Sequence, residues 1–167
     1  MMDKVIKLFK SIHCYLIGLS WIKFILVMTF FTYIIILPAV ILFLLFNNME
    51  IGGPANLITF SYLEFFKLVF IIPILETFIF QKSIIRLLTK LKKIRNKKII
   101  IILISALFFG IQHFYSLIYV FITFIIGILL AYSFIIYENK NKSAFWTVTF
   151  IHSLRNLVNF VLLYIYL

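Results

Sequence analysis

The chain has 167 residues, of which 65% are hydrophobic and 13% are charged, and its mean hydropathy is +1.17. A soluble domain is roughly 45–50% apolar with about 25% charged residues, so this composition excludes an ordinary soluble fold and predicts a protein that lies in a lipid bilayer. The formal net charge is +11, and half of the basic residues lie between Lys82 and Lys98, beside apolar runs. That placement is typical of the cytoplasmic ends of membrane spans, and no nucleic-acid-binding module is recognisable. The single cysteine, Cys14, excludes a disulfide within this chain.

The first segment, residues 1–20, combines the basic stretch Lys4–Lys10 with the apolar stretch His13–Trp21. No small-residue cleavage site follows, so the pattern does not favour a cleaved signal peptide. We expect residues 1–20 to form a retained amphipathic helix at the membrane surface.

The first predicted span is Trp21–Phe46, with a kink expected at Pro38. The stretch Asn47–Asn56 that follows is polar, contains two glycines and a proline, and has no Lys or Arg. It reads as a loop on the side opposite the cytoplasm.

A second apolar run begins near Leu57 and continues past Phe80, interrupted by Pro73. Proline removes a backbone donor and suits the first turn of a helix, so we expect a kink or a new helix at Pro73. The helix then continues toward Lys93 with a basic second half.

Three further spans complete the chain: Ile99–Phe114, Leu117–Tyr137 and Ala144–Tyr166. A tight junction at Tyr115–Ser116 separates the first two, and the polar loop Glu138–Ser143 precedes the last. The predicted fold class is therefore all-α: a polytopic membrane bundle of about five spanning helices with an N-terminal amphipathic helix. Residues 21–167 are expected to form a single transmembrane domain. With a cytoplasmic N-terminus, every Lys-rich loop falls on the cytoplasmic side.

Strongly polar side chains are costly in lipid and usually mark function. Inside these spans, the most suggestive of them form three groupings. The first is Glu76-Thr77-x-x-x-Gln81, in which Thr77 and Gln81 are neighbours on one helix face. A carboxylate in this position is suited to act as a general base. The alternative is that Glu76 serves helix packing.

The other two groupings are Phe109-x-x-x-His113 and His152-x-x-x-Asn156, each placing two side chains on one helix face. An aromatic ring beside a histidine can limit the access of water. An imidazole and a carboxamide can both donate hydrogen bonds to a developing oxyanion. The alternatives are a histidine at a helix end and polar contacts between helices.

Together, the three groupings supply what is needed to activate a water and stabilise a tetrahedral intermediate. Two histidines and a glutamate can also bind zinc, although the HExxH spacing is absent. The alternative is a non-enzymatic membrane protein, such as an immunity factor or a scaffold, that uses the same residues for packing or partner binding.

The three groupings resemble the motifs of the CPBP family, the CAAX-protease and bacteriocin-processing (Abi) intramembrane proteases. That family carries EExxxR, FxxxH and HxxxN or HxxxB on separate helices, in the same order and with a proline shortly before the first motif. The resemblance covers residues 73–159, the expected catalytic core. It implies that Glu76 and His113 activate a water, that His152 and Asn156 stabilise the oxyanion, and that no catalytic metal is needed.

Two positions depart from the family pattern, because Thr77 and Gln81 stand where the family has its second Glu and its Arg. Both side chains can still hydrogen-bond, so we expect a retained structural link between them. Arg155, beside Asn156, is expected to snorkel toward the interface, and Glu64 and Lys67 are expected to pair. The catalytic reading also requires a helix that continues unbroken past Lys82, since otherwise Glu76 lies too shallow in the membrane to reach His113.

The resemblance further implies a peptide or protein substrate, lipidated or membrane-embedded, and in one branch of the family a prenylated C-terminus. We expect a multi-pass protein of a bacterial cell membrane, with the lipid bilayer as its other partner and no nucleic acid.

Overall fold

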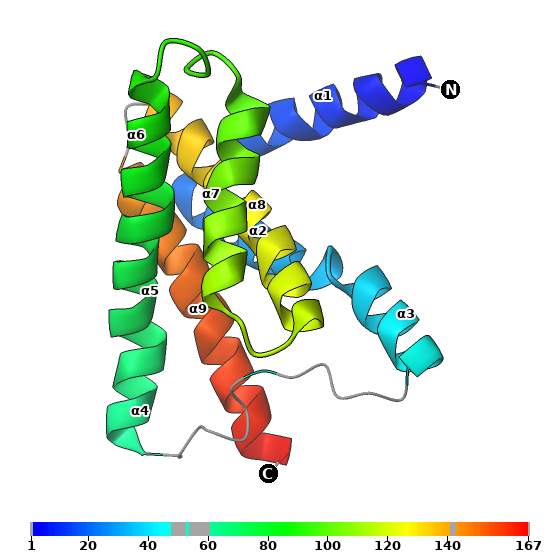
Figure 1. The fold of residues 1–167 in the computed structure, drawn as a ribbon, viewed down its shortest axis with the longest axis vertical. Coiled ribbons are helices and arrows are strands. Elements are labelled where there is room, and N and C mark those ends of the chain that lie inside the picture. The colour runs from blue at the N-terminus through cyan, green and yellow to red at the C-terminus, as the bar shows by residue number, and fades with distance from the viewer. Residues whose placement is uncertain (1, 48–52, 54–60, 141–142, 167) are drawn as a thin grey trace.

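A computed structural model describes residues 2–47, 53, 61–140 and 143–166, and every element within them is helical. This confirms the all-α prediction for that part of the chain (Figure 1). The helices are α1 (Met2–Gly18), α2 (Trp21–Ile34), α3 (Leu37–Asn47), α4 (Tyr62–Phe66), α5 (Ile72–Glu76), α6 (Ile84–Lys90), α7 (Lys98–Gln112), α8 (Leu117–Asn139) and α9 (Ala144–Tyr166). Most of the expected loop Asn47–Asn56 and part of the loop Glu138–Ser143 lie outside the described residues.

Within the described residues, three segments are long and apolar enough to cross a membrane: Trp21–Ile41, Leu117–Asn139 and Ala144–Ile165. The chain is thus built as a multi-pass membrane protein. Lys98–Gln112 is apolar but shorter, so length and composition support three of the five expected crossings.

The segment Tyr62–Lys90 forms one long helix, here called the α4–α6 rod, which includes two π-helical stretches, Lys67–Ile71 and Thr77–Ser83. No new helix begins at Pro73. The Ile72 N–H bonds to the Lys67 carbonyl, five residues back, and this wider turn fits the proline into the continuous helix. The rod ends at Lys90, three residues before the predicted end, and the requirement for an unbroken helix past Lys82 is met.

The predicted single span Trp21–Phe46 is instead two helices, because α2 ends at Ile34 and α3 begins at Leu37. Pro38 explains the position of the break. Its ring has no N–H to donate to the Ile34 carbonyl four residues earlier, and it crowds that carbonyl. Figure 1 shows α3 leading away from the other helices.

The predicted N-terminal helix is present as α1, which projects from the bundle in Figure 1. Leu16 is buried, whereas Leu8, Ile12 and Tyr15 are exposed. His13 ties the helix to α8 through a 2.7 Å contact between its Nδ1 and the Tyr132 hydroxyl. The placement of α1 at a membrane surface stays a prediction.

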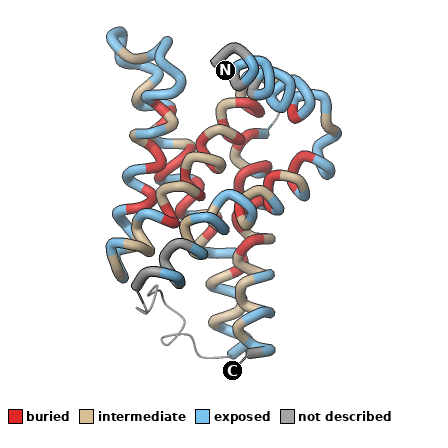
Figure 2. The backbone as a smooth tube through the Cα atoms, turned by 90° about the vertical axis from the view of Figure 1, so that its right-hand side faces the viewer, coloured by how far each residue is buried: buried red, intermediate tan, exposed pale blue. Residues whose placement is uncertain are grey.

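Close packing of α7 on α8 fixes the position of the C-terminal end of α7, where His113 lies. A Cβ atom added at Gly127 would come within 3.0 Å of the Ala106 backbone, and one at Gly110 within 3.0 Å of the Val120 carbonyl. A larger residue at either position would push the two helices apart by a few tenths of an ångström, so glycine favours this approach. Buried residues gather in the middle of the bundle (Figure 2). Glu76 and His152 are among the buried residues.

Candidate active site

Three helices bring one carboxylate and two imidazoles together inside the bundle. Glu76 ends α5 in the middle of the rod, His113 directly follows α7, and His152 lies within α9. Glu76 Oε1 lies 3.6 Å from His113 Nε2, and Glu76 Oε2 lies 3.5 Å from His152 Nε2. Two histidines that are 37 and 76 positions from Glu76 in the sequence thus face the same carboxylate, and all three side chains are mostly buried.

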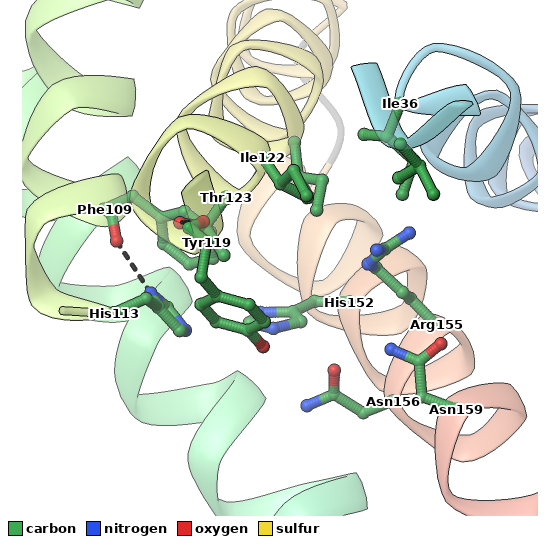
Figure 3. A pocket seen from close by; sticks show the side chains of 12 residues that line it. Ile36, Phe109, His113, Tyr119, Ile122, Thr123, His152, Arg155, Asn156 and Asn159 are labelled. Atoms are coloured by element: carbon green, nitrogen blue, oxygen red, sulfur yellow. Dashed lines mark hydrogen bonds between the residues drawn. The ribbon is translucent and has the colours of Figure 1, made fainter. Parts of the chain in front are cut away.

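The orientation of His113 is set by a backbone carbonyl. Its Nδ1 lies 2.8 Å from the Phe109 carbonyl (Figure 3), and because a carbonyl only accepts, the hydrogen sits on Nδ1. A neutral His113 therefore turns an unprotonated Nε2 toward Glu76. The two atoms lie 3.6 Å apart, beyond hydrogen-bond distance, so each can still accept a hydrogen bond from a third group.

Phe109 separates this polar group from the rest of the core. Its ring is 2% exposed, and its centroid lies 4.8 Å from that of His113 and 5.6 Å from that of His152. The expected contact of Phe109 with His113 is present, and it extends to the second histidine. An apolar ring against both imidazoles restricts where water can approach.

Gln112 is a member of the site to which the sequence pattern assigned no role. Its Nε2 lies 3.3 Å from Glu76 Oε1 and donates to it. The signal in the sequence was its position directly before His113. Tyr119 was also missed; its ring centroid lies 6.2 Å from that of His113.

Several buried polar atoms of the site have no hydrogen-bond partner among the described residues. They include Glu76 Oε2 and His152 Nδ1. Buried polar groups in structural roles are almost always hydrogen-bonded. Glu76 and His152 therefore keep hydrogen-bonding capacity that the fold itself does not use.

Thr77 and Gln81 are fully buried, but the predicted link between them is wrong. Neither the Thr77 hydroxyl nor either polar atom of the Gln81 amide has a hydrogen-bond partner in the described part of the chain. The physical reason is the π-helical stretch that begins at Thr77. Its wider turn removes the alignment of side chains four residues apart that an α-helix provides.

Asn156, one helical turn after His152, donates from Nδ2 to the Leu68 carbonyl of the rod at 2.9 Å. It also lines a cavity of about 220 Å³, shared with His113, His152 and Arg155. Figure 3 shows His113 arriving from the end of α7 while the other three project from α9. The remaining lining residues are Ile36, Val40, Phe109, Tyr119, Ile122, Thr123, Ile126 and Asn159.

Arg155 does not snorkel, contrary to the prediction. It is 8% exposed, and its Nη1 donates to the carbonyl and the hydroxyl of Thr32 at 3.1 and 2.9 Å. The guanidinium also lies 4.6 Å from the centre of the Tyr33 ring. The last turn of α2 has carbonyls without helical donors, so a buried arginine satisfies one of them.

The ionisable residues along the rod behave largely as predicted. Glu64 and Lys67 form an ion pair at 3.1 Å, and Arg86 approaches Glu138 at 3.4 Å. The Lys82 ammonium lies near the rings of Phe78 and Phe145. Their charges therefore do not interrupt the helix past Lys82.

In the part of the chain that the structure describes, no group of three or more His, Cys, Asp or Glu side chains has an arrangement that could hold a metal ion.

Comparison with known proteins agrees with this geometry. The family model described as type II CAAX prenyl endopeptidase Rce1-like matches residues 58–158, more than half of the chain and all three motifs. No curated protein and no solved structure matches the chain. The family implies a peptidase, and the buried Glu76 lies between its two histidines as described above. The chain belongs to the Rce1-like family of type II CAAX prenyl endopeptidases.

Proposed function

We propose that the chain is an intramembrane endopeptidase that hydrolyses a peptide bond with a water activated by Glu76 and His113. The observation that carries the proposal is the convergence of Glu76 with His113 and His152 at 3.6 and 3.5 Å. Hydrolysis needs a base and a group that stabilises negative charge, and three separate helices supply both here.

The proposed reaction begins when Glu76 and His113 take a proton from a water. The water oxygen bonds to the carbonyl carbon of the substrate, and the carbonyl oxygen becomes an oxyanion. His152 and the second amide hydrogen of Asn156 stabilise that oxyanion from α9. The proton then passes to the leaving amine as the C–N bond breaks, which leaves a carboxylate and an amine as products.

The proposed substrate is a peptide or protein that reaches the site from the membrane, with a prenylated C-terminus as the class that the family implies. The cavity supports this, because it offers polar groups from α7 and α9 beside apolar side chains such as Ile36 and Val40. We further propose that the α4–α6 rod and α7 cross the membrane with the three long spans. The chain then crosses five times, with its N-terminus in the cytoplasm.

The test is a cleavage assay on the full chain in liposomes, with prenylated and unprenylated peptides of one sequence. We expect wild-type protein to release product and Glu76→Gln to release almost none. Cleavage that persists at the wild-type rate in Glu76→Gln would overturn the role of Glu76.

Two other readings have their own outcomes. Zinc bound in a one-to-one ratio and lost together with activity on chelation would replace the metal-free mechanism by a zinc protease. An immunity factor or scaffold would cleave no substrate and would depend on Asn156 for stability alone. Glu76 Oε2 and His152 Nδ1, which have no hydrogen-bond partner among the described residues, favour the enzyme, because packing contacts use their hydrogen-bonding groups.

A further inference from the structure

The Leu68 carbonyl is left without its usual helical donor by the way the rod accommodates Pro73. In an α-helix this carbonyl would accept from the Ile72 N–H, and in a π-helix from the N–H of residue 73. The Ile72 N–H bonds to the Lys67 carbonyl instead. Residue 73 is proline and has no N–H.

Asn156 supplies the missing donor from another helix. Its Nδ2 lies 2.9 Å from the Leu68 carbonyl oxygen. One amide hydrogen is thereby used by the backbone of the rod, which leaves the second one and Oδ1 for the cavity. The bond joins α9 to the rod beside the proline, and Pro73 lies three residues before Glu76.

The same two helices also meet through polar groups where His152 Nε2 approaches Glu76 Oε2 at 3.5 Å. His152 and Asn156 are one turn apart on α9. A hydrogen bond at Leu68 therefore holds the rod against sliding or rotating along α9, and so sets where the Glu76 carboxylate lies relative to both histidines.

We propose that Asn156 acts mainly as a positioning residue, which clamps the carbonyl left free at Pro73 and thereby places Glu76 against His113 and His152. The inference rests on the proposed function. It adds to the proposed contact of the second amide hydrogen with the oxyanion, because the first hydrogen binds the protein backbone. Asparagine is needed at position 156 of α9 because Pro73 has no N–H for the Leu68 carbonyl.

Pro73→Ala offers a test, since alanine restores a backbone N–H that the Leu68 carbonyl can accept. We expect Asn156→Ala to lower kcat about a hundredfold, the effect of misplacing a reacting group by about 1 Å. Pro73→Ala alone should weaken the bond to Asn156 and lower kcat, whereas in the Asn156→Ala background it should lower kcat no further, because that bond is already absent. The matched control is Pro38→Ala on a different helix, whose effect on kcat should be the same with and without Asn156→Ala.

If Pro73→Ala and Asn156→Ala lower kcat independently, the clamp is wrong and Asn156 acts directly on the substrate. If Asn156→Ala does not fold, Asn156→Leu replaces it in the same pairing with Pro73→Ala. Leucine keeps the side-chain volume and lacks the donor. Midpoint temperatures of unfolding for the same variants provide a second readout. If the wild-type protein cleaves nothing, the proposed function fails. The clamp is then tested by stability alone: less-than-additive destabilisation by Pro73→Ala and Asn156→Ala supports it, and additive destabilisation overturns it.

Discussion

The two faces of α9 carry polar side chains of similar kinds, but they use them differently. On the face toward α2, Arg155 donates twice to Thr32 and Asn159 lies 3.0 Å from the Tyr33 hydroxyl. On the face toward the rod, His152 has an unpartnered Nδ1 in the described structure and approaches a Glu76 carboxylate that also keeps an unpartnered oxygen.

The difference separates polar groups that join helices from polar groups that are available for chemistry. A buried polar atom without a partner costs roughly 1–3 kcal/mol, and a fold tolerates that cost mainly where function requires it. We therefore expect substitutions on the face of α9 toward α2 to change stability, and substitutions on the face toward the rod to change activity.

The largest expected effect is that of Glu76→Gln. Removing the base should lower kcat about a hundred- to ten-thousandfold, while the Gln carbonyl oxygen can still accept from Gln112. Thermal unfolding should be unchanged or shifted upward, since a buried carboxylate is replaced by a neutral group. Cleavage and unfolding are measured on the same liposome preparation.

The control for that variant is Glu64→Gln, in the same rod but paired with Lys67 near its end. Its kcat should match the wild type. Equal losses in both variants would show that the rod tolerates no change of charge, and the special role of Glu76 would then be wrong.

His113→Ala is expected to have the next largest effect, a fall in kcat of about a hundredfold. The loss follows from removing the unprotonated Nε2 that faces Glu76. His13→Ala is the matched control, because His13 also hydrogen-bonds, to Tyr132, but lies on α1. Similar kinetics for the two variants would contradict the site.

Arg155→Met is expected to act on stability. The Thr32 carbonyl and hydroxyl would lose their donors, which should lower the free energy of unfolding by about 1–3 kcal/mol. Thr32→Val, which removes only the hydroxyl, should cost less. Denaturant or thermal unfolding measures both. Unaltered stability in Arg155→Met would remove the distinction between the two faces.

The smallest effect is expected from a pair of buried threonines on α9. Thr149 has no hydrogen-bond partner for its hydroxyl among the described residues, whereas Thr147 accepts from Trp21 and donates to the Ser143 carbonyl. Thr149→Val should be neutral or slightly stabilising, and Thr147→Val should cost about 1 kcal/mol. The reverse order of midpoint temperatures would contradict the assignment of partners.

The amino-acid sequence was sufficient to predict the membrane class, the helical fold and the three polar groupings. Hydropathy and charge placement predict spans because lipid tolerates few charges. The spacing of His152 and Asn156 indicated a shared helix face because an α-helix repeats every 3.6 residues. The same rule failed for Thr77 and Gln81, where the helix adopts a π-helical turn.

Only the tertiary structure decided how each polar group is used. Arg155 and Asn156 are adjacent in sequence, yet one serves a carbonyl of α2 and the other a carbonyl of the rod. At Pro73 a kink or a new helix was predicted, but the helix is continuous and leaves a carbonyl that another helix satisfies. Helix periodicity fixes which side chains share a face, whereas the partners across an interface depend on contacts between residues far apart in the chain. The convergence of Glu76 with His113 and His152 is such a contact.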